Sequence, residues 1–316
     1  MTQPLRDVWA TTLCELADEN PDLLVLDGDL GTSTRADRFA GAHPDRFLQM
    51  GIAEQNMVGV AAGLSTLGYV PWLSSFAVFF THRAIDQIRV LVAQPGANVK
   101  IGAAYSGLLT GFTGKTHQDV EDLAIMRAMP GMTVLAPGDA IECSAMVRWA
   151  TEMSGPVYLR LTRDAGPDLF DATYRFEPGR VITLRDGSDV LIVSTGPQTT
   201  RCLEAAVLLE ASGISAGVLH VPSLKPVDAA AIADAARRVR LVVSVEEHTI
   251  AGGLGGLVAE ILSERAPRRL VRIGIGDTWG ESASNAFLLD RHGLSPGRIA
   301  ERVARESSDL HMEVTR

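Results

Sequence analysis

The sequence predicts an α/β protein of two domains, and three observations carry this prediction. Short apolar runs alternate with segments of helical apolar period, a pattern typical of a parallel sheet covered by helices. The chain has 316 residues, which is enough for two hydrophobic cores. Residues 163–187 interrupt the alternation with a stretch rich in Asp, Gly and Pro. We therefore expect a parallel-sheet domain before this stretch, a linker with an edge hairpin within it, and a smaller α/β domain after it.

The individual elements follow from local patterns. The run DLLVL at 22–26 suits a strand that is buried on both faces. The segment 54–67 places Met57, Ala61 and Leu64 on one face of a helix. The expected elements of the first domain are helix 7–17, strand 22–26, helix 54–67, strand 69–73, helix 84–92, strand 99–104, helix 120–129, strand 133–135, helix 140–151 and strand 157–161. Those of the second domain are strand 190–194, helix 200–212, strand 216–221, helix 229–238, strand 241–245, helix 254–265 and strand 270–275.

The composition argues against several classes of function. Hydrophobic residues make up 46% of the chain, which argues against disorder. The net charge of −9 argues against a nucleic-acid or anionic-membrane surface, because both need clustered cations. No apolar run approaches the ~20 residues that span a bilayer, and residues 1–21 lack the core of a signal peptide. We therefore expect a cytoplasmic protein with neither nucleic-acid nor membrane partners.

The cysteines predict neither disulfides nor a zinc site. Cys14, Cys143 and Cys202 form no CxxC pair, and the sequence contains no HExxH. Free thiols fit a reducing cytoplasm. We expect no metal ligands from this chain.

Three glycine-containing motifs fit other protein classes poorly. The GISAG segment at 213–217 matches the GxSxG of serine hydrolases, but it lies after a helix and before a strand, which is the wrong order. The GKT at 114–116 would need a glycine where Leu109 stands to form a phosphate loop. A nucleotide hydrolase that uses Lys115 is a minor alternative. The glycines of GGLGG at 252–256 are expected to pack the next helix closely against the sheet.

Three segments predict a shared cleft. The segment 50–57 carries Glu54 at the start of an apolar helix, the segment 74–80 contains three phenylalanines, and a polar loop contains His117. Each feature alone has an ordinary explanation: a first-turn glutamate facing solvent, a core aromatic cluster and a surface histidine. Because all three lie near strand ends of one sheet, we expect them to meet.

These segments and several others resemble the transketolase family. GIAEQNM, SFAVFFTHRAIDQIR, THQDVEDLAIMRAMPGM, VLAPGDAIE and YLRLTR are similar to its pyrimidine-binding half. GSDVLIVSTG, VPSLKPVD and VEEHTIAGGLGG are similar to its C-terminal domain. The resemblance implies a pyrimidine-binding domain at 1–168, a linker at 169–188 and a transketolase C-terminal domain at 189–316. The chain thus looks like the C-terminal subunit of a split transketolase.

The resemblance also implies a cofactor and a partner. Family members bind thiamine diphosphate and Mg²⁺ through a GDG motif followed by an asparagine, whereas residues 27–30 contain only GD and no such asparagine follows. The resemblance therefore implies that an N-terminal subunit supplies the diphosphate and Mg²⁺ site, and that this chain binds the pyrimidine end. Two copies of each chain would form a heterotetramer with two sites.

Residue roles follow from the same resemblance. Glu54 looks like the glutamate that activates the cofactor through a pyrimidine nitrogen, and His117 like the loop histidine that contacts substrate. Phe79 resembles the aromatic that stacks on the pyrimidine, at roughly 0.5–1.5 kcal/mol beyond area burial, and Phe76 a pocket wall. The remaining cofactor-site candidates are His82, Asp29 and Leu30. The substrate-site candidates are Arg6, Ser33, His117, Arg163, Tyr105 and Lys115.

Two departures bear on the substrate. Tyr105 stands where a phosphate-binding histidine is usual, and Thr113 where the family has a sugar-reading aspartate. Arg6 and Arg163 still favour a phosphorylated or other anionic sugar. We expect transfer of a two-carbon ketol unit from a ketose to an aldose, with donor and acceptor open. The alternatives are the β subunit of a 2-oxo acid dehydrogenase E1 component, a 1-deoxyxylulose-5-phosphate synthase-like enzyme, and a non-catalytic homologue.

Overall fold

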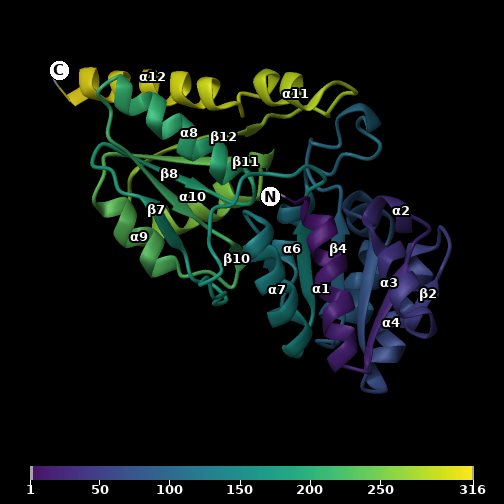
Figure 1. The fold of residues 1–316 in the computed structure, drawn as a ribbon. Helices are drawn as coiled ribbons and strands as arrows, with labels where there is room; N and C mark the ends of the chain where they lie inside the picture. Colours follow the sequence, from purple (N-terminus) through teal and green to yellow (C-terminus); the bar gives the residue numbers. More distant parts are fainter. Residues whose placement is uncertain (1–2, 315–316) are drawn as a thin grey trace.

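The computed structural model describes residues 3–314, with side chains described through residue 310, and it contains two sheets (Figure 1). The seven-stranded sheet has the order β10-β5-β6-β4-β3-β1-β2. Its strands are β1 (Leu23–Asp27), β2 (Phe47–Gln49), β3 (Val70–Phe76), β4 (Lys100–Ala104), β5 (Thr133–Leu135), β6 (Val157–Leu161) and β10 (Ser223–Lys225). All neighbours are parallel except β10 and β5. The strands β1, β4 and β6 are buried along their whole length, which explains their continuous apolar runs.

Helices cover both faces of this sheet. One core contains Trp9, Phe39 and Met146 from helices of the first face, packed against the strands. The opposite core contains Met57 and Met126. The helical elements of this domain are α1 (Leu5–Glu19), α2 (Gly31–Thr34), α3 (Ala36–Ala42), η1 (Pro44–Arg46), α4 (Glu54–Thr66), η2 (Phe79–Arg83), α5 (Ile85–Gln87), η3 (Ile88–Ala93), η4 (Gly111–Thr113), α6 (Asp122–Ala128) and α7 (Ala140–Glu152).

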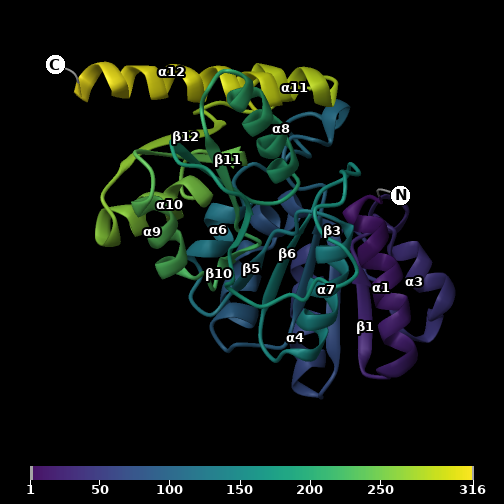
Figure 2. The same cartoon turned by 60° about the vertical axis from the view of Figure 1, so that its left-hand side comes forward.

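The second sheet has five strands in the order β12-β11-β8-β9-β7. Its strands are β7 (Ile182–Arg185), β8 (Val190–Ser194), β9 (Ala216–His220), β11 (Leu241–Thr249) and β12 (Arg269–Ile275). Its helices are α8 (Gln198–Ala211), α9 (Ala229–Arg237), α10 (Leu254–Arg265), α11 (Asn285–Arg291) and α12 (Pro296–Val314). Helices α8 and α12 pack side by side on one face, as both views show (Figure 2), while α9 and α10 join the core shared with the first domain.

The two-domain α/β fold class is confirmed, although several elements differ from expectation, among them α2, α3, β2 and β10, which were not predicted. The predicted helix 84–92 is a short α-helix between two π-helices, η2 and η3, closed by bonds from Ala84 N to Phe79 O and from Gln94 N to Arg89 O. The predicted edge hairpin is a single strand, β7, which pairs antiparallel with β9. Helices α11 and α12 lie after the last predicted element. The sequence did not predict α12 because its apolar residues form only a narrow stripe on a charged helix.

Within residues 3–314, every helix is too short or too polar to cross a bilayer.

Candidate active site

An aromatic cluster lies where β3 and β4 end. Phe76 closes β3 and Tyr105 follows β4, so their rings meet at the carboxyl edge of the parallel sheet and stack with centroids 4.0 Å apart. Phe79 stacks on Phe76 at 5.8 Å. His117 reaches the cluster from the following loop, edge-on to Phe76 at 5.9 Å and to Phe79 at 5.6 Å. The structure therefore brings two of the three predicted segments together, and they form a stacked aromatic cluster beside an imidazole.

Glu54 joins this cluster through an arginine. It begins helix α4 but is only 1% exposed, so the solvent-facing explanation for this glutamate is wrong. Arg83 Nη1 donates to both carboxylate oxygens of Glu54 at 2.8 Å. The Arg83 guanidinium carbon lies 4.2 Å from the centre of the Phe79 ring. The third predicted segment is thus linked to the other two by one side chain.

The predicted anion-binding residues meet around Tyr105. Arg6 Nη1 donates to Ser33 O at 2.7 Å and to the Tyr105 hydroxyl at 2.8 Å. The guanidinium carbons of Arg6 and Arg163 lie 5.3 and 5.5 Å from the centre of the Tyr105 ring. Two guanidinium groups around one phenol form a cationic surface that fits a tetrahedral oxyanion.

The loop at 106–119, which carries His117, is anchored by the second domain. Glu247 accepts hydrogen bonds from two backbone amides of the loop, at 2.8 and 3.1 Å. Gln118 Nε2 donates to Glu281 O at 3.0 Å. Lys115 is exposed and, within residues 3–314, makes no hydrogen bond or ion pair, so it does not join the other predicted residues.

The segment after β1 contributes Leu30 but not the Asp29 carboxylate. Leu30 packs against Phe76 and its neighbours, and its backbone N–H donates to the buried Asp27 carboxylate at 2.9 Å. Burial raises the pKa of Asp27. Asp29 is exposed with a positive φ of 65°, and its backbone N–H donates to Gln49 Oε1 at 3.1 Å.

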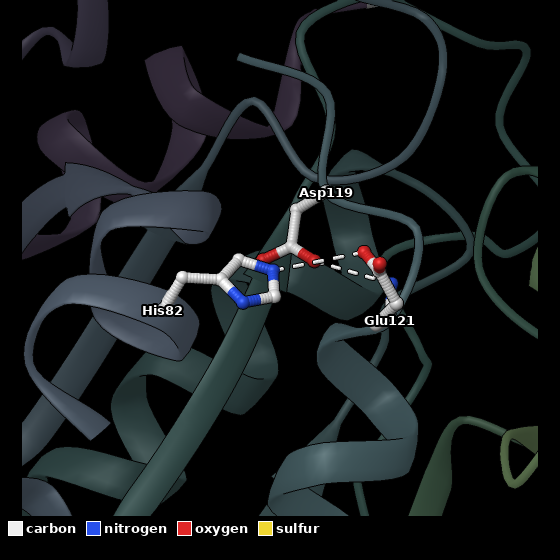
Figure 3. A group of neighbouring side chains, drawn as sticks. All are labelled: His82, Asp119 and Glu121. Carbon is white, nitrogen blue, oxygen red and sulfur yellow. Dashed lines mark hydrogen bonds and ion pairs between the residues drawn. The ribbon is translucent and has the colours of Figure 1, made fainter. Parts of the chain in front are cut away.

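His82 lies in a titratable cluster with Asp119 and Glu121 (Figure 3). Its Nε2 is 3.7 Å from Glu121 Oε2, and this partner raises the pKa of His82. Asp119 is fully buried; it accepts hydrogen bonds from Thr81 Oγ1 at 2.6 Å and from Glu121 N at 3.2 Å. Burial, followed by the nearby Asp122 carboxylate, raises the pKa of Asp119 to about 7. Ligand atoms of His82, Asp119 and Glu121 lie within 4.8 Å of one another, so this group could hold a divalent cation.

Sequence reasoning assigned no role to Arg83, Asp119 or Glu121. All three stand inside segments that already carried predicted residues. Two facts point to Arg83: a buried carboxylate such as Glu54 needs a nearby cation, and Arg83 directly follows the predicted His82.

The glycine run at 252–256 has the predicted packing role. The start of α10 is closed by the chain's own Glu246, whose carboxylate accepts hydrogen bonds from Leu254 N and Gly255 N at 2.7 Å each. A side chain at Gly253 would overlap this carboxylate, because its Cβ would lie 2.3 Å from Glu246 Oε2.

Comparison with known proteins agrees with the geometry. Residues 2–168 match the model of the "Transketolase, pyrimidine binding domain", which includes the GKT segment, and residues 179–299 match that of the "Transketolase, C-terminal domain". A solved structure described as "Split gene transketolase, inactive beta4 tetramer" is 44% identical, with a TM-score of 0.88 over 98% of this chain and 99% of that one.

Two subunits of named transketolases are also similar. The 6-deoxy-6-sulfo-D-fructose transketolase subunit of Clostridium sp. (strain MSTE9) is 37% identical over 96% of this chain and 94% of its own. An apulose-4-phosphate transketolase subunit from Phocaeicola vulgatus is 36% identical over 94% of this chain and 95% of its own. The resemblance seen in the sequence is confirmed: the chain belongs to the transketolase family, as a C-terminal subunit of the split type.

Proposed function

We propose that this chain is the pyrimidine-binding subunit of a thiamine diphosphate-dependent transketolase that transfers a two-carbon ketol unit from a ketose to an aldose. The observation that carries the proposal is a buried carboxylate, Glu54, that is joined through Arg83 to the aromatic ring of Phe79. Family membership supports the same cofactor, because the matched domain is a pyrimidine-binding domain.

The described residues fit the pyrimidine end of the cofactor. Phe79 and Phe76, with Leu30 packed against them, form an apolar aromatic wall beside which an aromatic ring could bind, and His82 lies one turn from Phe79. Glu54 is buried and can share a proton with a ring nitrogen. When bound, thiamine diphosphate supplies the nucleophilic carbon and electron sink that cleavage beside a carbonyl requires. In this proposal Phe79 orients the ring, Glu54 holds the proton at its nitrogen, and His117 hydrogen-bonds the substrate.

The substrate is an anionic sugar in this proposal. Arg6, which bonds Ser33 O and the Tyr105 hydroxyl, and Arg163, which lies near the same Tyr105 ring, would bind a terminal phosphate or sulfonate bidentately. The two named relatives support this class, since their sugars carry a sulfonate in one case and a phosphate in the other. Lys115 would add positive potential from the loop, and Asp29 would lie at the rim.

The partner is an N-terminal transketolase subunit that holds the diphosphate and Mg²⁺, in a heterotetramer of two plus two chains. The incomplete diphosphate motif at 27–30 supports this assembly. The similar split-gene structure is described as an inactive tetramer of β chains, which agrees with a need for a second kind of subunit.

The test is co-expression with the candidate partner, followed by assays of phosphorylated, sulfonated and neutral ketoses with aldose acceptors, thiamine diphosphate and Mg²⁺. We expect ketol transfer with an anionic sugar. The substitution Glu54→Gln should lower kcat by ~10²–10⁴-fold. The matched control is Glu152→Gln, an exposed glutamate at the end of α7.

Full activity of Glu54→Gln, or no transfer by the assembled pair with any sugar, would overturn the proposal. Release of CO₂ from pyruvate without ketol transfer would instead support the 2-oxo acid dehydrogenase or 1-deoxyxylulose-5-phosphate synthase-like alternatives.

A further inference from the structure

We propose that Arg83 is the positioning residue for Glu54. In this inference, which rests on the proposed function, Arg83 fixes the orientation of the carboxylate that meets the pyrimidine. Its guanidinium in turn lies over the ring of Phe79, which belongs to the aromatic wall of the same site.

The contact between the two side chains constrains the carboxylate strongly. Arg83 Nη1 lies 2.8 Å from each oxygen of Glu54, so one edge of the carboxylate is held by a single nitrogen. The Glu54 side chain is fully buried, whereas that of Arg83 is 42% exposed. A buried carboxylate is costly without a cation, and Arg83 supplies it from the solvent side. The anti lone pair of each oxygen stays available for a ring nitrogen.

The backbone holds Arg83 in place as well. The π-helical turn from Phe79 to Arg83 is closed by the bond from Ala84 N to Phe79 O, and it brings the guanidinium back over the Phe79 ring at 4.2 Å. Gln55 Nε2 donates to Arg83 O at 2.9 Å. Two consecutive residues of α4 therefore bind the same arginine: Glu54 contacts its side chain, and Gln55 contacts its backbone.

This arrangement explains why arginine stands here rather than lysine. A planar guanidinium can lie on an aromatic ring and donate to a carboxylate at the same time, whereas an ammonium group is a compact point charge. A lysine would keep the charge beside Glu54 but lose the planar contact with Phe79. The substitution Arg83→Lys therefore separates positioning from charge.

The experiment uses the assembled complex with the diphosphate-binding partner. We would compare Arg83→Met, Arg83→Lys, Glu54→Gln and the double variant Arg83→Met/Glu54→Gln. The control is Arg89→Met, an exposed arginine of the neighbouring helix with a loose 3.8 Å pair to Asp86. The measurements are kcat at saturating thiamine diphosphate, the Kd of the cofactor by tryptophan fluorescence, and the near-ultraviolet circular dichroism of the bound cofactor.

We expect Arg83→Met to lower kcat by roughly 10- to 100-fold, the cost of a misplaced catalytic group, with a changed dichroism band. Arg83→Lys should assemble normally and fall between Arg83→Met and the unmodified chain. In the Glu54→Gln background, removing Arg83 should change kcat by less than about twofold, because coupled residues are not additive.

Equal losses from Arg83→Met in both backgrounds would overturn the inference, since Arg83 would then act independently of Glu54. An Arg83→Lys variant with unmodified kcat and dichroism would overturn it too, and this variant decides the question if Arg83→Met does not assemble. Retained activity in Glu54→Gln would overturn the proposed function itself, whatever Arg83 does.

Discussion

The two ends of the candidate site differ in how their charge is balanced. At the cofactor end, Glu54 is buried and paired with Arg83. At the substrate end, Arg6 and Arg163 surround Tyr105, and within residues 3–314 no carboxylate pairs with either arginine. The cofactor end is therefore electrostatically complete within the chain, while the substrate end lacks only an anion. Changes at the cofactor side should disturb the protein itself, and changes at the substrate end should disturb ligand binding alone.

The largest effect is expected in the pH dependence of the protein's stability, through Asp119. This residue accepts a hydrogen bond from Thr81, which lies in the same turn as Phe79 and Arg83. Because burial raises the pKa of Asp119 to about 7 from an ordinary 3.8, the folded chain binds this proton more tightly than the unfolded one, and stability falls as pH rises from about 4 through 7. Asp119→Asn, which mimics the protonated form, should exceed the unmodified chain in stability at pH 8 by ~2–4 kcal/mol. The gap should shrink toward pH 4.5.

Thermal melts between pH 4.5 and 8, with a chelator present to keep divalent cations from the His82 cluster, measure this effect. The exposed Asp45→Asn serves as the control. A gap that does not change with pH would contradict the assignment of the effect to Asp119.

At the substrate end, Arg163→Gln should lower kcat/KM for an anionic ketose by roughly 10- to 100-fold, the worth of a charge-assisted hydrogen bond. The loss should appear mainly in KM and be smaller for a neutral ketose. The melting temperature should change little, because Arg163 makes no hydrogen bond or ion pair with the residues that the structure describes. Steady-state kinetics on both sugars give the comparison, with Arg148→Gln, a partly exposed arginine paired with Glu15, as control. An equal loss with both sugars would remove Arg163 from anion recognition.

The smallest effect is expected at Lys115. Since this side chain is exposed and the structure gives it no ion pair within residues 3–314, Lys115→Ala should change kcat/KM by less than about fivefold, the range of exposed charge interactions. The change should diminish at high salt. A larger, salt-independent loss would place Lys115 directly on the substrate.

The parts that were predictable from the sequence are those whose cause is local. The helix that starts at Glu54 follows from its apolar spacing, and the cluster of Phe76, Phe79 and His117 follows from the rule that parallel strands end at one edge. The family resemblance added the roles that spacing alone does not supply.

The parts that were missed depend on distant partners. Arg83 meets a carboxylate 29 residues earlier in the chain, and no local pattern marks that pair. The π-helical turns around residues 79–93 look like an ordinary helix in apolar spacing. Strand β7 lies inside residues 169–188, which read as a linker, because only its pairing with β9 makes it part of the second sheet.

The short strand β10 has a consequence for the chain's two halves. It comes from the second domain, yet it pairs with β5 at the border of the first sheet, with Ser223 opposite Leu135. A fragment that stopped at residue 168 would leave the backbone donors and acceptors of β5 bare on that side. An unpaired edge strand can form hydrogen bonds with a strand of another chain. The separated first half should therefore self-associate rather than remain a free monomer.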